Sequence, residues 1–250
     1  PDSMPSSTPA QRCRYFIGGN WIDFSALPTA PVFNPSTGDV IGAVPLAGAA
    51  EVDAAVQAAQ AAFPAWAETS VIDRARILFR YRALIEKNFN EIARLISREH
   101  GKTYAESRGD LFRGLEVVEF ACGGPTLMMG DMLGQVARGV DCDTMRCPLG
   151  VCVGITPFNF PAMIPLWMFP LALVTGNTFV LKPSERVPFT AMRLAELLDE
   201  AGLPKGVFNL IHGGKPSVDA LLTHPLVKAI SFVGSTPIAR YTHKTASQHG

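Results

Sequence analysis

The chain has 250 residues, of which 48% are hydrophobic, and its 22 basic and 22 acidic residues give a net charge of zero. This length and apolar content allow a sizeable core and one or two domains. The balanced charge, without any long run of like charges, argues against nucleic acid or an anionic membrane as the main partner. The longest apolar stretch, residues 161–174, contains three prolines and is too short for a membrane span, so we interpret it as a buried helix.

The five cysteines form no C-x-x-C pair, and the five histidines are scattered. This spacing does not match a zinc site, so we expect no bound metal. Residues 1–14 are rich in Ser and Pro and lack the apolar segment of a secretory signal. The sequence therefore indicates free thiols in a reducing cytoplasm, with residues 1–14 as a disordered lead-in.

The first half of the chain changes from strand-like to helical periodicity. A hairpin is expected at residues 15–21, with Gly18-Gly19-Asn20 at its turn, then a turn at residues 32–38 and a strand at residues 40–44. Apolar residues then recur at i, i+3 and i+4, which is typical of amphipathic helices. These helices are predicted at residues 51–66, 73–86, 90–100 and 104–122, with Gly101 as a C-cap and residues 123–125 ending the fourth.

Residues 126–148 have a different pattern, with two short strand-like pieces, 134–138 and 141–146, beside polar turns. We interpret residues 126–146 as a hairpin arm that stands away from the main body. Beyond Gly150, strands and helices alternate, which predicts an α/β fold with a parallel sheet covered by helices. The strands are expected at 151–155, 178–181, 207–211 and 229–233, and the helices at 163–174, 189–201, 218–223 and 238–246.

Three polar clusters follow strands of this predicted sheet: Thr156–Asn159, Lys182–Arg186 and Gly234–Thr236. Ligands of open parallel sheets bind at the carboxyl ends of the strands, so the fold is able to bring the three clusters together. Two familiar nucleotide motifs are absent. Residues 100–103 (HGKT) resemble the end of a P-loop but lack its first Gly, and no G-x-G-x-x-G follows a strand.

Each cluster has a functional and a structural interpretation. Lys182 and Glu185 have the chemistry to hold ribose hydroxyls, or they form a surface ion pair beside a helix cap. Gly234 and Ser235 precede a helix whose backbone N–H groups attract phosphate, or Ser235 or Thr236 simply caps that helix. Asn159, between prolines in apolar surroundings, donates to an oxyanion or forms a turn with nearby backbone.

These motifs, in their order and spacing, resemble the aldehyde dehydrogenase superfamily. They are PFNFP at residues 157–161, KPSE at 182–185 and FVGST at 232–236. The wider string from Pro157 to Pro188 is more specific and resembles the CoA-acylating methylmalonate-semialdehyde dehydrogenase branch, although most relatives have Trp where Phe158 stands. The resemblance runs from about Tyr15 to Gly250 and covers the amino-terminal part of that family's chain.

The resemblance implies oxidation of malonate or methylmalonate semialdehyde, with NAD as hydride acceptor, CoA as acyl acceptor and loss of carbon dioxide. It implies a homotetramer, and an NAD-binding domain made of residues 15–125 and 147–250, incomplete at its carboxyl end, with residues 126–146 as the oligomerisation arm. Thr156 and Phe158 would line the nicotinamide side of the site. Lys182 and Glu185 would hold the adenosine ribose, Arg186 would lie at the adenosine end, and Gly234 and Ser235 would meet the pyrophosphate.

For the reaction itself, the resemblance implies that Asn159 is the oxyanion donor. Arg113 is a candidate partner of the substrate carboxylate, and a solvated helix-face arginine is its plain alternative. The family's nucleophilic Cys is expected beyond Gly250, because none of the five cysteines has a matching context. Two alternatives therefore remain open: a hydrolytic aldehyde dehydrogenase, and a truncated, non-catalytic protein that binds NAD or another subunit.

Overall fold

The computed structural model describes residues 11–249, and the first ten residues of the expected lead-in lie outside this range. The protein is built around a six-stranded sheet in the order β11-β8-β9-β10-β2-β3. The first four of these strands run parallel, while β2 and β3 form the predicted hairpin, which adds two antiparallel strands at one edge. The strands are β2 (Tyr15–Ile17), β3 (Asn20–Ile22), β8 (Val151–Ile155), β9 (Thr178–Lys182), β10 (Phe208–Leu210) and β11 (Val227–Phe232).

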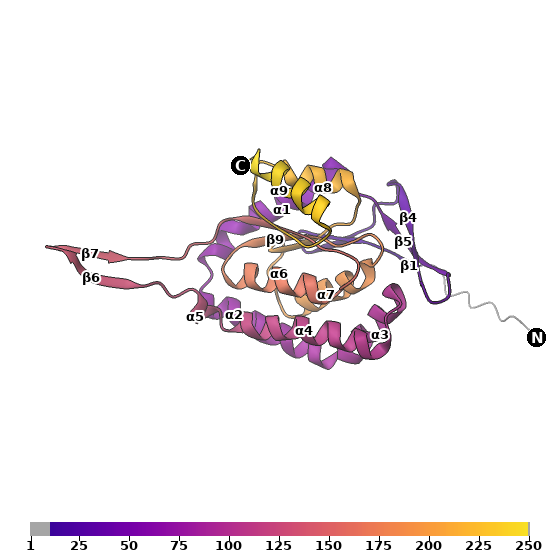
Figure 1. The fold of residues 1–250 in the computed structure, drawn as a ribbon, viewed down its shortest axis with the longest axis horizontal. Helices are drawn as coiled ribbons and strands as arrows, with labels where there is room; N and C mark the ends of the chain where they lie inside the picture. Colours follow the sequence, from indigo (N-terminus) through magenta and orange to yellow (C-terminus); the bar gives the residue numbers. More distant parts are fainter. Residues whose placement is uncertain (1–10, 250) are drawn as a thin grey trace, which may run out of the picture.

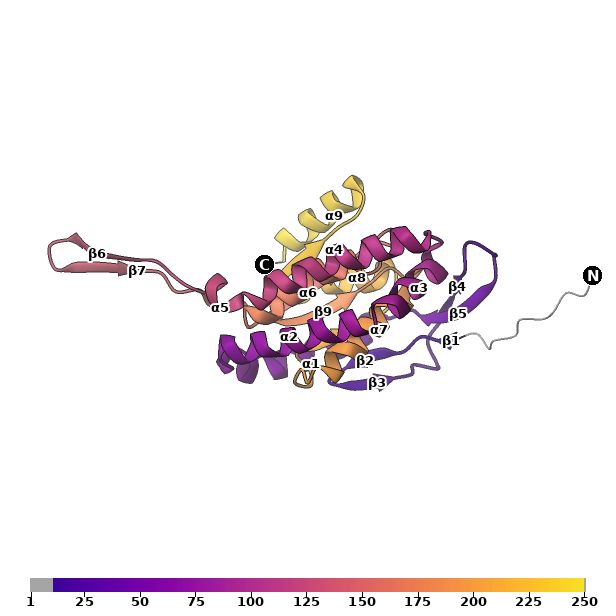
Figure 2. The ribbon, with the colours of Figure 1, turned by 90° about the horizontal axis from the view of Figure 1, so that it is seen from below.

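Helices cover both faces of this sheet (Figure 1). One face carries α1 (Ala49–Glu68) with α8 (Lys215–Leu222) and α9 (Thr236–Ser247). The other carries α6 (Met163–Val174) and α7 (Pro188–Glu200), and beyond them an outer layer, seen in front of the sheet in Figure 2. The outer layer consists of α2 (Val71–Lys87), α3 (Phe89–His100) and α4 (Tyr104–Cys122), with the short α5 (Gly124–Leu127) after it.

The central strands are buried on both faces, as their unbroken apolar runs predicted. Every residue of β8 and β9 is buried. Val153 and Val180 point into the core beneath α1, while Phe179 and Leu181 belong to the core shared with α6 and α7. The sheet therefore separates two hydrophobic cores, and its residues alternate between them. This α/β architecture confirms the predicted fold class.

The region before α1 corrects the boundary of the predicted lead-in. Gln11–Arg12 form β1, which pairs with β5 (Val40–Pro45), and Cys13 is fully buried. A further strand that the sequence did not predict, β4 (Thr29–Phe33), pairs antiparallel with β5. The three strands form a second small sheet beside the main one. Residues 11–14 are therefore part of the folded body.

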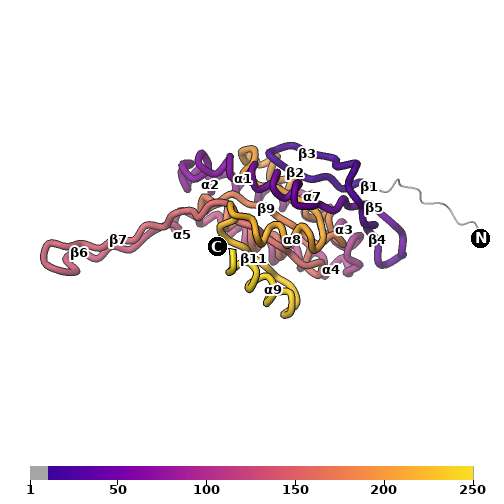
Figure 3. Tube along the Cα trace, turned by 90° about the horizontal axis from the view of Figure 1, so that it is seen from above, coloured from indigo at the N-terminus to yellow at the C-terminus, as the bar shows by residue number. Residues whose placement is uncertain are grey.

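The hairpin at residues 132–143 extends far from the body in all three views (Figures 1–3). Its strands are β6 (Met132–Ala137) and β7 (Val140–Asp143), and all ten of their residues are exposed. The predicted strands began later along the sequence, at residues 134 and 141. The ends of the two strands are set by cross-strand pairing and not by composition. The pairs run from Met132 opposite Asp143 to Ala137 opposite Val140, which is why the predicted starts were wrong. Within residues 11–249, no helix has the length and apolar character needed to cross a membrane.

Candidate functional site

A cavity of about 550 Å³ lies at the carboxyl ends of β8, β9 and β11. Its wall includes residues from all three polar clusters that follow these strands. Of the residues proposed for a site, it is lined by Thr156, Phe158, Lys182, Glu185, Gly234 and Ser235. The arrangement follows from the parallel sheet, which places the carboxyl ends of neighbouring strands at one edge. The structure thus brings together most of the predicted site residues, while their binding roles remain predictions.

Lys182 is the most buried charged group of this cavity, with 4% of the residue exposed. Its Nζ donates a hydrogen bond of 2.9 Å to the carbonyl oxygen of Gly213 and lies 3.9 Å from a carboxylate oxygen of Glu185. Burial lowers the pKa of Lys182, and the Glu185 carboxylate opposes that shift. The surface ion pair considered for these two residues is therefore half correct: the carboxylate is partly exposed, but the ammonium is not.

Phe158 stands between two groups at the edge of the cavity. The Arg186 guanidinium lies 5.2 Å from the centre of its ring, and the His100 ring lies nearly parallel to it at 6.3 Å. Phe158, Glu185 and Arg186 also line a second cavity, of about 620 Å³, which reaches toward Glu99 and β4. Arg186 therefore lies in the wall of the second cavity and not in that of the first.

Ser235 occupies the N-cap position of α9, but its side chain makes no capping hydrogen bond to that helix. The first helical bond instead joins the Ala239 N–H to the Ser235 carbonyl oxygen, at 2.9 Å. Both Gly234 and Ser235 are exposed at the cavity. The side-chain capping that we considered for Ser235 is therefore not observed, and Ser235 lines the cavity without that bond.

Asn159 and Arg113 lie elsewhere. Asn159 is exposed, in contrast to the apolar surroundings that its neighbours suggested, because the loop after Pro157 leaves the sheet and turns into solvent. Arg113 is exposed on α4, where its carbonyl oxygen accepts a hydrogen bond from the Trp167 indole. Neither residue lines the two cavities just described. Their catalytic and substrate-binding roles are left as predictions.

The sequence interpretation missed a polar group in the wall of the first cavity. Lys215 at the start of α8 and Tyr241 in α9 both line it, and Asp219 in α8 bonds to both side chains. The signal was present: Gly213-Gly214-Lys215 is a polar turn that follows the carboxyl end of β10. The rule that selected the other three clusters applies to this one as well.

No cysteine lines the cavity. Cys13, Cys122 and Cys152 are buried, and burial raises the pKa of these thiols to about 12, 11 and 11 respectively. Cys142 lies in the arm and Cys147 just after it, and both are exposed. A thiol with a raised pKa is a poor nucleophile at neutral pH. Within residues 11–249, no group of three or more His, Cys, Asp or Glu side chains is arranged to hold a metal ion.

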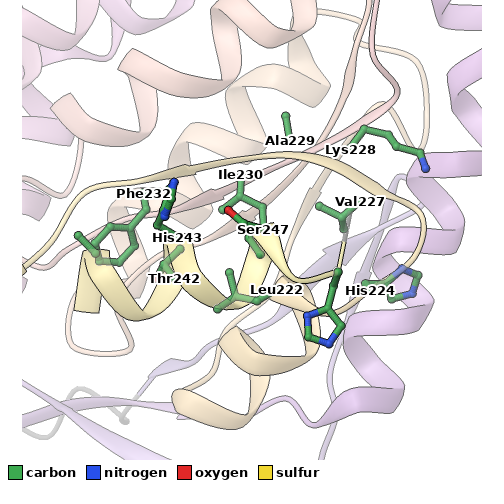
Figure 4. A pocket seen from close by; sticks show the side chains of 13 residues that line it. Leu222, His224, Val227, Lys228, Ala229, Ile230, Phe232, Thr242, His243 and Ser247 are labelled. Carbon is green, nitrogen blue, oxygen red and sulfur yellow. The ribbon is translucent and has the colours of Figure 1, made fainter. Parts of the chain in front are cut away.

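A separate cavity of about 390 Å³ lies between β11 and α9. Figure 4 shows His224, His243 and Lys228 around it, together with the apolar side chains of β11. Among the lining residues it shares only Phe232 with the first cavity, and it contains none of the residues given a binding or catalytic role from the sequence. We therefore place the candidate site in the first cavity.

Comparison with known proteins agrees with the architecture. The model of the aldehyde dehydrogenase family matches residues 21–250. A malonate-semialdehyde dehydrogenase of Halalkalibacterium halodurans is 52% identical over 247 residues, which are 99% of this chain and 51% of that protein. The chain therefore spans about half the length of the curated relatives that it matches.

Solved structures give the same result. A Sinorhizobium meliloti protein described as a methylmalonate-semialdehyde dehydrogenase, in complex with NAD, is 48% identical and superposes with a TM-score of 0.94 over 97% of this chain and 50% of its own. An Escherichia coli structure described as an NADP dependent enzyme is 35% identical, with a TM-score of 0.92 over 96% of this chain and 50% of its own. The predicted resemblance is confirmed: the chain belongs to the aldehyde dehydrogenase family.

Proposed function

We propose that the full-length protein containing this chain oxidises malonate or methylmalonate semialdehyde, with NAD as hydride acceptor and CoA as acyl acceptor, and releases carbon dioxide. The observation that carries the proposal is the 52% identity, over nearly the whole chain, to a malonate-semialdehyde dehydrogenase. The cavity at the strand ends supports it, because its wall combines a buried ammonium, a carboxylate and a free hydroxyl at a helix start.

The residues of the cavity fit a dinucleotide. Lys182 and Glu185, 3.9 Å apart, offer a donor and an acceptor for the two hydroxyls of the adenosine ribose. Ser235 and the N–H groups at the start of α9 would hold the pyrophosphate. Thr156 and Phe158 would line the nicotinamide side, and Arg186 the adenosine end. Bound NAD would supply the hydride acceptor, while these side chains orient it.

Two exposed residues would act on the substrate. Asn159 would donate its amide N–H to the developing oxyanion, a contribution on the order of 3 kcal/mol for such donors. Arg113 would bind the carboxylate that both semialdehydes carry, through its planar pair of N–H donors. The attacking thiolate would come from a cysteine outside residues 1–250, since the cysteines in this chain are either buried with raised pKa values or on and beside the arm.

Assembly belongs to the same proposal. The arm exposes several large apolar side chains on two strands that form a separate two-stranded sheet in the described chain. They include Met132, Leu133, Val136 and Val140. An exposed two-stranded ribbon of this kind is marginally stable alone and gains stability by pairing with other strands. We therefore assign the arm to subunit contacts in a homotetramer.

The experiment that tests the reaction is NADH formation by the full-length protein with malonate semialdehyde, with and without CoA. We expect sustained turnover only with CoA, and acetyl-CoA as the product by chromatography. Equal turnover without CoA would favour the hydrolytic alternative. Binding of NAD without any turnover under either condition would favour the non-catalytic alternative.

A further inference from the structure

The cluster of Lys215, Asp219 and Tyr241 connects α8 and α9 in the wall of the first cavity. The Lys215 Nζ lies 2.5 Å from an Asp219 carboxylate oxygen and donates to the Tyr241 hydroxyl at 3.2 Å, and that hydroxyl donates to the other Asp219 oxygen at 2.8 Å. The ammonium also lies 4.8 Å from the centre of the Tyr241 ring. α8 and α9 thus jointly hold one cation in place on the cavity wall.

This cation and the proposed ribose-binding pair line the same cavity. The buried Lys182 ammonium donates to the Gly213 carbonyl oxygen, only two residues before Lys215. Lys215 therefore extends from the same turn that Lys182 contacts, whereas Ser235 reaches the cavity from the start of α9. Lys182, Glu185 and Lys215 line one cavity, so a ribose held by Lys182 and Glu185 would share that cavity with the Lys215 ammonium.

Lys215 has one hydrogen-bond donor left for a ligand. An ammonium group carries three N–H donors, and Asp219 and Tyr241 accept two of them. Hydrogen bonding to Asp219 raises the pKa of Lys215, which keeps the ammonium charged at neutral pH. The bonds to Asp219 and Tyr241 already restrain the Lys215 side chain. Binding a ligand through the third N–H therefore costs less side-chain entropy than it would for an unrestrained lysine.

The charges around the ribose position are balanced in pairs. Glu185 carries a negative charge that would repel a phosphate, but the Lys182 ammonium lies 3.9 Å away. Asp219 is likewise paired with Lys215. Because each carboxylate is paired with an ammonium, the two pairs carry no large net negative charge that would repel a phosphate. A hydrogen bond from the remaining N–H donor of Lys215 would then favour binding of the phosphate.

We propose that Lys215 anchors a phosphate monoester on the ribose of an adenosine nucleotide bound in this cavity. The inference rests on the proposed nucleotide-binding function of the site. The phosphate meant is one on the 2′ or 3′ oxygen: NADP carries a 2′-phosphate, and CoA carries a 3′-phosphate. The solved relatives include one structure that holds NAD and one described as NADP dependent, so recognition of this position differs within the family.

The test uses calorimetry on the full-length protein with three probes: 5′-AMP, adenosine 2′,5′-bisphosphate and adenosine 3′,5′-bisphosphate. We expect at least one bisphosphate to bind about tenfold more tightly than 5′-AMP, which corresponds to about 1.4 kcal/mol. Lys215→Met should remove this advantage, and Lys215→Arg should retain it. A 2′ preference identifies the NADP-type phosphate, and a 3′ preference identifies the CoA-type phosphate.

Three controls separate the anchor from general charge and folding effects. Lys87→Met removes an exposed lysine in α2 and should leave all three affinities unchanged. Asp219→Asn removes the competing carboxylate and should increase the advantage of the bisphosphate several-fold. Added salt should reduce the advantage, because the Lys215 side chain is largely exposed.

The anchor is overturned if 5′-AMP binds but neither bisphosphate binds more tightly, or if the advantage persists in Lys215→Met. Failure of every probe and of NAD to bind would be a different result. It would reject the proposed nucleotide site itself, together with the anchor that depends on it.

Discussion

Lys182 is the single residue on which the nucleotide site depends most. Its buried ammonium already donates to the Gly213 carbonyl oxygen, so a ribose hydroxyl would meet a rigid, charged donor. Hydrogen bonds to charged groups contribute about 1.5–3 kcal/mol. We expect Lys182→Ala to weaken NAD binding about tenfold to a hundredfold in the full-length protein. Glu185→Ala should have a smaller effect, since that carboxylate is partly exposed.

Calorimetric titration with NAD measures both effects, and urea unfolding of each variant separates lost binding from lost stability. Lys87→Ala, on the surface of α2, is the matched control for removing one positive charge. Unchanged NAD affinity in both Lys182→Ala and Glu185→Ala would remove the ribose assignment.

Glu99 makes the stability of the protein depend on pH. Burial raises its pKa to about 7, although its carboxylate accepts hydrogen bonds from the backbone of Phe189 and from Thr190. In the unfolded chain the pKa is about 4.3, so between pH 4.3 and 7 the folded state holds a proton that the unfolded state has lost. The free energy of unfolding should therefore fall as pH rises through this window, by on the order of 3 kcal/mol.

Urea unfolding at a series of pH values from about 4.5 to 8 measures this slope. Glu99→Gln cannot ionise and should flatten the curve across the window, whatever its effect on absolute stability. The idea fails if wild type and Glu99→Gln lose stability in parallel as pH rises.

At the scale of the elements, Gly101 ends α3 in a conformation that favours glycine. Its φ is +85°, and an added Cβ would lie 2.9 Å from Pro35 Cγ. Gly101→Ala should destabilise the protein by about 1–2 kcal/mol, because an L-residue in the left-handed region is strained and Pro35 has to move. Gly109 provides a matched contrast inside α4, where an added Cβ meets nothing within 4 Å. Gly109→Ala should stabilise by about 0.5–1 kcal/mol.

Denaturant unfolding of the two single variants compares these opposite signs directly. If Gly101→Ala and Gly109→Ala change the free energy of unfolding in the same direction, backbone conformation does not control the effect at one of the two positions.

The elements that could be predicted from sequence are those whose own residues determine them. α4, α6 and β8 have the predicted bounds, because a long amphipathic period, an uncharged apolar run and a buried strand are local signals. β4 was not predicted, and its last two residues, Val32 and Phe33, fall in the turn expected at residues 32–38; the strand is defined by its pairing with β5. Strands at sheet edges depend on distant partners that a single sequence does not display.

The site shows the same division. Strand ends could be predicted, and with them the convergence of Lys182, Glu185 and Ser235 on one cavity. The exposure of Asn159 and the bond between Lys215 and Tyr241 could not. These depend on how a loop leaves the sheet and on how α8 packs beside α9, which is long-range geometry. Residue types and strand ends therefore predict where a site lies, while partners across helices require the structure.

At the scale of the whole molecule, the body and the arm have separate sources of stability. The body has two hydrophobic cores, one on each side of the sheet, and no residue of β6 or β7 belongs to either. Removing the arm should therefore leave the fold of the body intact. The same exposed apolar side chains, however, are what the proposed tetramer would bury.

We expect deletion of Met132–Asp143, closed by a two-residue Gly-containing turn, to abolish tetramer formation while the near-UV circular dichroism of the body is retained. The closure is feasible because the Thr144 N–H donates to the Asp131 carbonyl oxygen at 2.9 Å. Light scattering of the full-length protein gives the mass.

Leu133→Asp with Val140→Asp should have the same effect without a deletion, because buried unpaired carboxylates oppose assembly. Ile72→Asp places a carboxylate on a similarly exposed position at the start of α2 and should leave the mass unchanged. A tetramer that survives both arm variants would show that the subunits associate through the body, and the arm would then need another explanation.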